Sequence, residues 1–305
     1  MPPKPSSNRE MAWLLRGEIA ARVWPKRWAG YSNTRTYFKR AGFSMSKDVT
    51  DAVREICLGM HDTTEVISRD SPNFRVANKT FGIYQINHHG DGRVALWLHS
   101  PDGAQAFYVA EDPNHYFVPP YVGPSGWLGV NLDTGLDWQT ISKQIHAAYT
   151  RVAPAKVAVQ QTEPVTIKPP SEGIDPAIFD PYQRPEIAAK LAQISQYCLA
   201  LPETRLEKQF GSPCFRAGKK TFCTLHFYRG LLEVGVWAGG EEQALRIADP
   251  RFRIPKYIGH RGWLNLDIGK RMDMEEVGEL ILTSYEHYAL KRMLRALQDI
   301  QGNLL

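Results

Sequence analysis

Basic side chains are interleaved with aromatic ones in the last third of the chain, and this composition suits nucleic-acid binding. The cations fall in one short loop, at a predicted hairpin tip and along the segment that leads to Trp263. Lys and Arg contact phosphate oxygens, and Tyr and Trp rings accept unstacked bases. The candidate phosphate-binding residues are Arg216, Lys219, Lys220, Arg229, Arg253, Lys256 and Arg261.

A set of aromatic residues offers a second possibility, a cleft between two domains that holds a small molecule. Ligand sites are mostly apolar, with a few polar groups that fix orientation. Recurrence of some of these aromatics at equivalent positions also fits a role in the core or in closing a loop. The candidate cleft residues are Trp97, Trp127, Trp237, Trp263, Tyr121 and Tyr257.

Motifs that would mark catalysis or metal binding are missing from the sequence. It contains no nucleophile elbow, His-Glu-x-x-His pair, phosphate-binding glycine loop or dinucleotide fingerprint. The pair His88-His89 lies beside a predicted turn, where solvated side chains are the better interpretation than a metal site. The four cysteines form no Cys-x-x-Cys pair and suit burial in a reducing cytoplasm. The sequence therefore favours a non-enzymatic binding protein without cofactor or metal.

The chain repeats one pattern after 141 residues. Residues 71–81 recur as 212–222 with seven of eleven positions identical. The motif Tyr-x-Gly-x-x-Gly-Trp begins at Tyr121 and again at Tyr257. Solenoid repeats run to roughly 20–50 residues, so this longer period indicates a duplicated globular domain.

Apolar spacing and turn residues predict the elements that must position these side chains. In the first copy we expect a helix from Asp48 to about 58, and a helix from the N-cap Asp137 to about 152. Between them we expect strands over 79–87, 93–99, 115–118 and 127–131, with a short helix over 105–111. In the second copy we expect helices over 185–200 and 241–248, and strands over 221–228 and 231–237.

The last helix is predicted to begin at Asp273 and to run past Leu297. Asp273 and Glu276 have the spacing of a capping box, in which each side chain binds the other residue's backbone N–H.

Charge is distributed unevenly between the two copies. Residues 48–153 carry seven Lys and Arg against twelve Asp and Glu, whereas 187–305 carry seventeen against thirteen. A polyanion would therefore meet the second copy rather than the first. Docking of the acidic copy on the basic one would explain the same asymmetry without an outside partner.

The domain boundaries follow from the repeat. Residues 1–46 are Arg-rich and resemble neither copy, and we interpret them as a basic arm, an organelle presequence or an over-extended start. Residues 47–153 and 186–305 form the two domains. The proline-rich residues 154–185 are expected to act as a semi-rigid spacer, and the part near 178–182 is an alternative candidate for docking on a domain.

Each copy resembles the MmcQ/YjbR-like family, also called DUF419. The resemblance is carried by Phe74-Arg75, by Asp112-Pro113 and by the closing Ala148-Tyr149 segment, together with the motif at Tyr121. It implies an α+β fold in which an antiparallel sheet is flanked by helices, similar to double-wing DNA-binding domains. It also implies DNA as a partner, although fold likeness alone is a weak argument for function.

The combined prediction is a cytoplasmic monomer in which two α+β domains form an internal pseudo-dimer, with no membrane segment. The basic second domain is expected to bind DNA, and a small-molecule cleft between the domains is the alternative.

Overall fold

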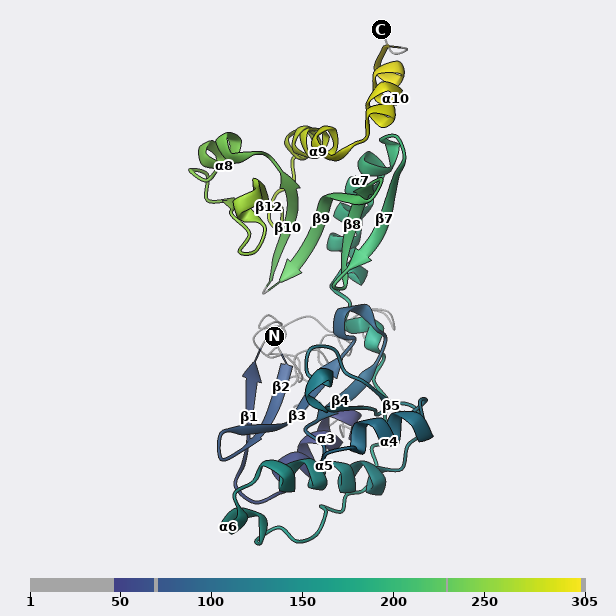
Figure 1. Cartoon of the computed structure of the whole chain (residues 1–305), viewed down its shortest axis with the longest axis vertical. Helices are drawn as coiled ribbons and strands as arrows, with labels where there is room; N and C mark the ends of the chain where they lie inside the picture. Colours follow the sequence, from purple (N-terminus) through teal and green to yellow (C-terminus); the bar gives the residue numbers. More distant parts are fainter. Residues whose placement is uncertain (1–46, 69–70, 229, 303–305) are drawn as a thin grey trace, which may run out of the picture. The chain divides into compact units, whose positions relative to one another are not determined.

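The computed structural model describes residues 47–68, 71–228 and 230–302. The predicted arm at 1–46 and the candidate Arg229 lie outside these residues. After Phe179 the chain divides into two compact units. Each unit has one antiparallel six-stranded sheet with helices packed against it, which confirms the predicted fold class (Figure 1).

Unit 1 is built from the helices and strands that the sequence predicts, with two further strands between its first helix and the first predicted strand. Asp48 caps its first helix in a capping box with Asp51, and Asp137 caps its long helix. Its elements are α3 (Val49–Leu58), β1 (Thr63–Ser68), β2 (Ser71–Val76), β3 (Lys79–Ile86), β4 (Val94–Leu98), α4 (Ala104–Glu111), β5 (Tyr116–Phe117), β6 (Leu128–Asn131), α5 (Trp138–Val152) and α6 (Ala155–Ala158).

Unit 2 repeats this order and adds one helix at its end. Its elements are α7 (Pro185–Ala200), β7 (Thr204–Gln209), β8 (Ser212–Ala217), β9 (Lys220–Tyr228), β10 (Leu231–Trp237), α8 (Gly240–Arg246), β11 (Phe252–Arg253), β12 (Trp263–Asp267), α9 (Met274–Tyr288) and α10 (Lys291–Gly302).

The two sheets share one topology and one irregularity. Their strand orders are β1-β2-β3-β4-β6-β5 and β7-β8-β9-β10-β12-β11. In both, the second and third strands shift register between the Phe and the Arg of the repeated pattern, at Phe74/Arg75 and at Phe215/Arg216. The repeated pattern at 71–81 and 212–222 therefore encodes a bulged hairpin.

Residues that recur in both copies form the two cores. Phe81 and Phe222 are fully buried, and each ring meets a buried tyrosine edge-on, Tyr149 at 5.9 Å and Tyr285 at 5.4 Å between centroids. The tyrosine hydroxyls donate to backbone carbonyls that precede β1 and β7. Burial raises the pKa of Tyr285 to about 12, so this hydroxyl keeps its proton.

The proline-rich residues 154–185 contribute side chains to the cores of both units. Ile174 and Phe179 are buried in the core of unit 1, and Tyr182 is buried in the core of unit 2. The Ser142 hydroxyl donates to the Val165 carbonyl at 2.6 Å. Apolar side chains spaced between the prolines explain this packing, because they remove apolar area from water.

The end of unit 2 differs from the sequence-based expectation in two ways. The predicted continuous helix is broken, because Ala289 adopts an extended conformation (φ −66°, ψ 145°) between α9 and α10. Ala153 does the same after α5, so the break is a feature of both copies. The predicted capping box is also wrong: Asp273 accepts from the N–H of Glu275, while the Glu276 side chain binds arginines.

Within the described ranges, no helix is long and apolar enough to cross a membrane.

Candidate functional site

The motif Tyr-x-Gly-x-x-Gly-Trp builds the same loop in both units. A Cβ on Gly123 would lie 2.5 Å from a Val118 methyl carbon, and one on Gly259 would lie 2.2 Å from the matching methyl of Ile254. The second glycine, Gly126 or Gly262, has a φ near +80°, a region that favours glycine. Close packing and backbone geometry thus account for both glycines.

A repeated glutamine fastens this loop to the short helix of each unit. Gln105 Nε2 in α4 donates to the carbonyls of Gly123 and Trp127 at 2.8 and 2.6 Å. Gln243 Nε2 in α8 donates to the carbonyls of Gly259 and Trp263 at 2.9 and 2.7 Å. The motif and its glutamine are therefore a structural clamp.

The three candidate cleft residues of unit 1 have different environments. Trp127 stacks on His99, with 5.0 Å between ring centroids. Trp97 is 3% exposed and meets His88 edge-on at 4.8 Å. Tyr121 is 61% exposed and lies 6.0 Å from His88. Trp97 and Tyr121 therefore both contact His88, whereas Trp127 packs elsewhere, against His99.

The cleft candidates of unit 2 are mostly used in packing. Trp237 stacks on His287 at 3.5 Å, and Trp263 Nε1 donates to the Tyr288 hydroxyl at 3.0 Å. Trp237 and Trp263 are direct cross-strand partners in β10 and β12. Only Tyr257, 80% exposed, presents its ring to solvent.

Two of the predicted phosphate-binding arginines are already paired with carboxylates. Arg216 Nε lies 2.8 Å from a Glu207 oxygen on the neighbouring strand β7. Arg253 in β11 pairs with Glu233 of β10. Each cation is neutralised within the sheet, which weakens its case as a phosphate ligand.

The four other described candidates are exposed but lie in two separate places. Lys219 lies in the turn between β8 and β9, and Lys220 is the first residue of β9. Lys256 and Arg261 lie in the connection between β11 and β12, where the Lys256 ammonium sits 5.7 Å from the Tyr257 ring centroid. Three strands separate β8 from β11 in the sheet order, or roughly 19 Å across four strand spacings.

Helix α10 adds cations that the sequence reading did not single out. Lys291 and Arg295 are exposed and one turn apart, whereas Met293 and Leu297 on the opposite face are buried. A Cβ on Gly218 would lie 3.6 Å from a Leu290 methyl carbon, so α10 begins beside the β8–β9 turn. We call Lys219, Lys220, Lys291 and Arg295 the turn–helix surface. The helical spacing of cations and apolar residues in 291–297 is the sequence signal that could have indicated the basic face of α10.

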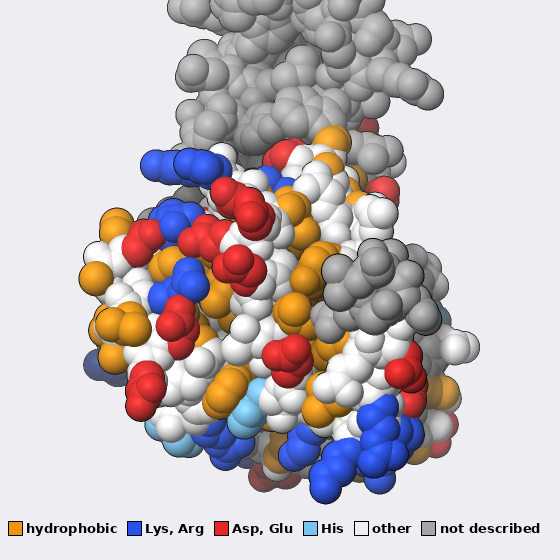
Figure 2. Space-filling model, turned by 90° about the horizontal axis from the view of Figure 1, so that it is seen from above, with side chains coloured by type: hydrophobic (Ala, Val, Ile, Leu, Met, Phe, Trp, Pro, Cys, Tyr) orange, Lys and Arg blue, Asp and Glu red, His pale blue; other side chains and the backbone are white. Residues whose placement is uncertain are grey.

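The basic side chains of unit 2 differ in whether they are paired with carboxylates. Figure 2 shows basic and acidic side chains alternating at the upper left, and a group of Lys and Arg side chains at the lower right. Among the residues that the structure describes, no ion pair involves a member of the turn–helix surface. Arg292, between two of its members, pairs with Glu203.

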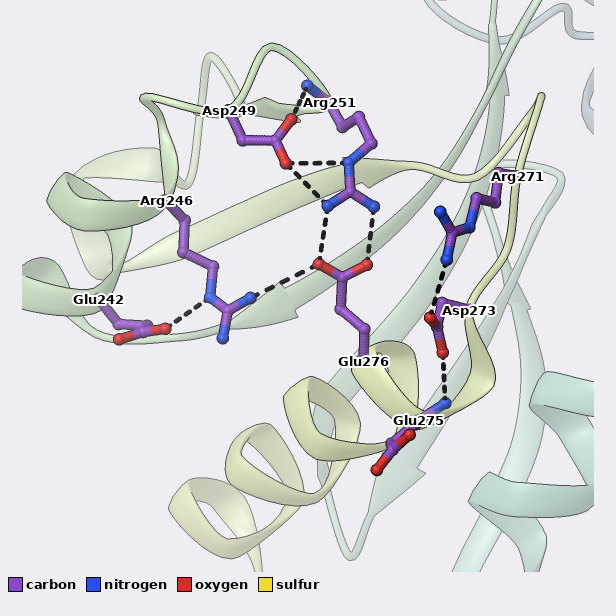
Figure 3. Close-up of polar contacts among 8 residues, drawn as sticks. All are labelled: Glu242, Arg246, Asp249, Arg251, Arg271, Asp273, Glu275 and Glu276. Atoms are coloured by element: carbon purple, nitrogen blue, oxygen red, sulfur yellow. Dashed lines mark hydrogen bonds and ion pairs between the residues drawn. The ribbon is translucent and has the colours of Figure 1, made fainter.

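An ionic network around Glu276 occupies two further arginines of unit 2, Arg246 and Arg251, so they are not free to bind phosphate. The Glu276 carboxylate accepts from Arg251 at 2.8 and 2.9 Å and lies 3.7 Å from Arg246 (Figure 3). Asp249 binds Arg251 as well, and these hydrogen bonds raise the pKa of Arg251 above its ordinary value. The network joins α8, the turn before β11 and the first turn of α9.

Exposed apolar residues also recur at matching positions, which the sequence reading missed. Phe107 and Leu245 each lie two residues after the clamping glutamine, and Val118 and Ile254 each pack on the first motif glycine. All four are at least 49% exposed. Alignment of the two copies through the glutamine would have shown them.

Within residues 47–68, 71–228 and 230–302, no three His, Cys, Asp or Glu side chains converge as a metal site. His88 is held neutral, because burial and then the neighbouring His89 lower its pKa to about 4. All four cysteines are buried as free thiols, and burial raises the pKa of Cys57 well above its usual value.

Comparison with known proteins identifies the class of domain. The family model described as YjbR matches residues 58–151 and again residues 199–287. The chain therefore belongs to the YjbR family and carries two of its domains in tandem, as the resemblance predicted.

The chain is also similar to a solved structure. The crystal structure of Deinococcus radiodurans protein DR2400, described with a DUF419 domain, shares 14% identity at a TM-score of 0.32. The match covers 42% of this chain and 96% of that one. Comparison with curated proteins gave no match.

Proposed function

We propose that this protein binds nucleic acid without catalysis, through phosphate contacts made by the turn–helix surface of unit 2. The observation that carries this proposal is that four exposed cations, two at the β8–β9 turn and two on α10, which begins beside that turn, have no carboxylate partner among the described residues. Unpaired Lys and Arg can release counterions from phosphate, which supplies most sequence-independent affinity.

The equivalent surface of unit 1 lacks this character, which gives the second copy the binding role. Asn78 stands where unit 2 has Lys219, and Lys79 is the counterpart of Lys220. After α5 the chain enters the short helix α6, where unit 2 has the basic α10. Unit 1 then serves chiefly as an architectural partner.

The first test is salt dependence. Binding of a fluorescein-labelled DNA duplex should weaken steeply between 50 and 200 mM NaCl, with a log–log slope of about 0.9 per phosphate neutralised. Four contacts predict a slope of roughly −3.6. Affinity that does not change with salt would contradict the proposal.

The second test assigns the site. Replacing Lys219 and Lys220 together by Gln should remove about two phosphate contacts. The log–log salt slope should therefore become less steep by about 1.8, and binding at low salt should weaken. The matched control Lys79→Gln, at the equivalent exposed position of unit 1, should leave binding unchanged. Equal effects of the two variants would reject the turn–helix surface.

A further inference from the structure

Unit 1 contains a group of aromatic and polar side chains around Trp97 that is separate from the phosphate-binding proposal. His88 lies between Trp97 and Tyr121, and the Tyr121 hydroxyl is 2.9 Å from His89 Nε2. Asn131, at the end of β6, is cross-strand partner to Ala95, two residues before Trp97. We call Trp97, His88, His89, Tyr121 and Asn131 the Trp97 cluster.

Three polar atoms of this cluster are buried without a hydrogen-bond partner in the part of the chain that the structure describes. They are Trp97 Nε1, His88 Nε2 and Asn131 Oδ1. The Trp97 side chain is 3% exposed and Asn131 is 7% exposed. Most buried polar atoms are hydrogen-bonded, so a group of three without partners calls for a specific explanation.

Unit 2 keeps a tyrosine at the position of Tyr121 but builds the same sheet without the tryptophan and the two histidines. Trp97 pairs with Ile83 and Gly129, and the residue in the same register of unit 2 is Gly235, which pairs with Thr224 and Asn265. The hairpin that carries His88 and His89 is shortened in unit 2, where Tyr228 already pairs with Leu231. Trp97, His88 and His89 are therefore specific to unit 1 and are not needed to form a sheet of this topology.

Three residues at or next to this cluster have a left-handed backbone conformation. Asn87, His89 and Tyr121 have φ values of 53°, 53° and 65°, in the left-handed region that non-glycine residues seldom adopt. Strained residues of this kind gather at binding sites, where the surrounding structure holds them in place. Tyr121 is the exposed member of the cluster, and its hydroxyl is held 2.9 Å from His89 Nε2.

We propose that the Trp97 cluster binds a neutral, planar heteroaromatic molecule that carries a lactam, a ring carbonyl next to a ring N–H. The Trp97 N–H would donate to the lactam carbonyl, and Asn131 Oδ1 would accept from the lactam N–H. The rings of His88 and Tyr121 would supply the aromatic contacts. A neutral ligand also suits an acidic domain, because no charge repulsion opposes its entry.

The experiment uses the full chain and a matched pair of probes. 2-Quinolone has the lactam, whereas quinoline has a similar two-ring shape without the carbonyl and the N–H. Isothermal titration should show saturable binding of 2-quinolone and at least tenfold weaker binding of quinoline. Trp97→Phe, which keeps an aromatic ring and removes the N–H, should weaken 2-quinolone binding by roughly tenfold.

Two further variants make the result decisive. Trp127→Phe, the same substitution at a tryptophan of unit 1 outside the cluster, should bind 2-quinolone within twofold of the wild type. Tyr121→Ala changes an exposed side chain and should not disturb folding. Its affinity for 2-quinolone should fall at least fivefold. This variant tests the site even if Trp97→Phe does not fold.

The proposal is overturned if 2-quinolone does not bind at millimolar concentration, or if quinoline binds equally well. It is also overturned if a folded Trp97→Phe, or Tyr121→Ala, binds like the wild type. DNA binding by the turn–helix surface does not depend on this result, so the two proposals can fail separately.

Discussion

Gly259 shows how a single repeated residue is fixed by packing. The Ile254 methyl carbon occupies the space that a Gly259 side chain would need, at 2.2 Å from the ideal Cβ position, and the same contact exists at Gly123. The recurrence of the motif glycines in both copies therefore reflects the geometry of a clamped loop rather than ligand recognition.

We expect Gly259→Ala to destabilise the protein by about 1–3 kcal/mol, because the added methyl overpacks a closed contact. Urea unfolding followed by circular dichroism measures the change. Gly240→Ala is the matched control, since its Cβ would meet nothing within 4 Å and it lies in the first turn of α8. If Gly259→Ala left the free energy of unfolding unchanged, the loop would have to relax around the added methyl group, contrary to this account.

His88 should make unit 1 sensitive to acid. Its pKa is lowered by burial to about 4, below the ordinary value near 6.5. Between pH 6.5 and pH 4 the unfolded chain binds a proton at His88 and the folded chain does not. The free energy of unfolding is therefore unaffected by protonation of His88 above pH 6.5 and decreases as the pH falls toward 4.

We expect His88→Gln to lose less stability than the wild type between pH 7 and pH 5. Thermal unfolding at several pH values measures this difference. The exposed His61→Gln on the same unit is the control and should follow the wild-type profile; the same acid dependence in His88→Gln would refute the assignment.

At the scale of elements, the Glu276 network stabilises the contact of α8 with α9. Its ion pairs join two helices and a turn, and the bidentate geometry of Arg251 on Glu276 favours a measurable contribution. Isolated surface ion pairs contribute little, but networks of partly buried groups contribute more.

Replacing Glu276 by Ala should cost about 1–2 kcal/mol, because it leaves Arg246 and Arg251 without their shared carboxylate. Denaturant unfolding at 0.05 and 1 M NaCl should show a smaller loss at high salt. Glu275→Ala is the control on the same helix turn, since the Glu275 side chain is exposed. Equal losses for both variants would exclude the network as the cause.

Most elements could be predicted from sequence because their patterns are local. The helix from Asp137 to Val152 and the hairpin strands of both copies follow from caps, periodicity and turn residues. The strands β1, β2, β7 and β8 were not foreseen. The side chains of β7 are largely exposed, and those of β1 are only half-buried or exposed, so neither edge strand carries a strong apolar alternation. The break before α10 was also missed, since unit 2 has Leu290 where unit 1 has Pro154.

The candidate sites were harder to predict, because pairing depends on neighbours that are distant in sequence. Nothing local indicates that Arg253 meets Glu233, twenty residues earlier, while Lys219 remains without an acidic partner among the described residues. The sequence shows where the Lys and Arg residues are. Only the pairing of the strands shows which of them, such as Arg253, meet a carboxylate and which, such as Lys219, do not.

At the scale of the whole molecule, duplication has preserved the architecture and allowed the surfaces to diverge. Residues shared by both copies lie in cores, hairpins and clamps, such as Phe81 and Phe222 or Gln105 and Gln243. Most candidate binding groups are residues that differ: Lys219 and α10 in unit 2, and Trp97, His88 and His89 in unit 1. A tandem of two domains can in this way hold two different sites on one scaffold.

The most direct test of the nucleic-acid proposal is a ¹H–¹⁵N NMR titration of the full chain with a short DNA duplex. We predict chemical-shift changes concentrated in unit 2 at the β8–β9 turn and the first turn of α10, and fading as salt is raised. Shift changes centred in unit 1, or none at low salt, would contradict the assignment of phosphate binding to the second domain.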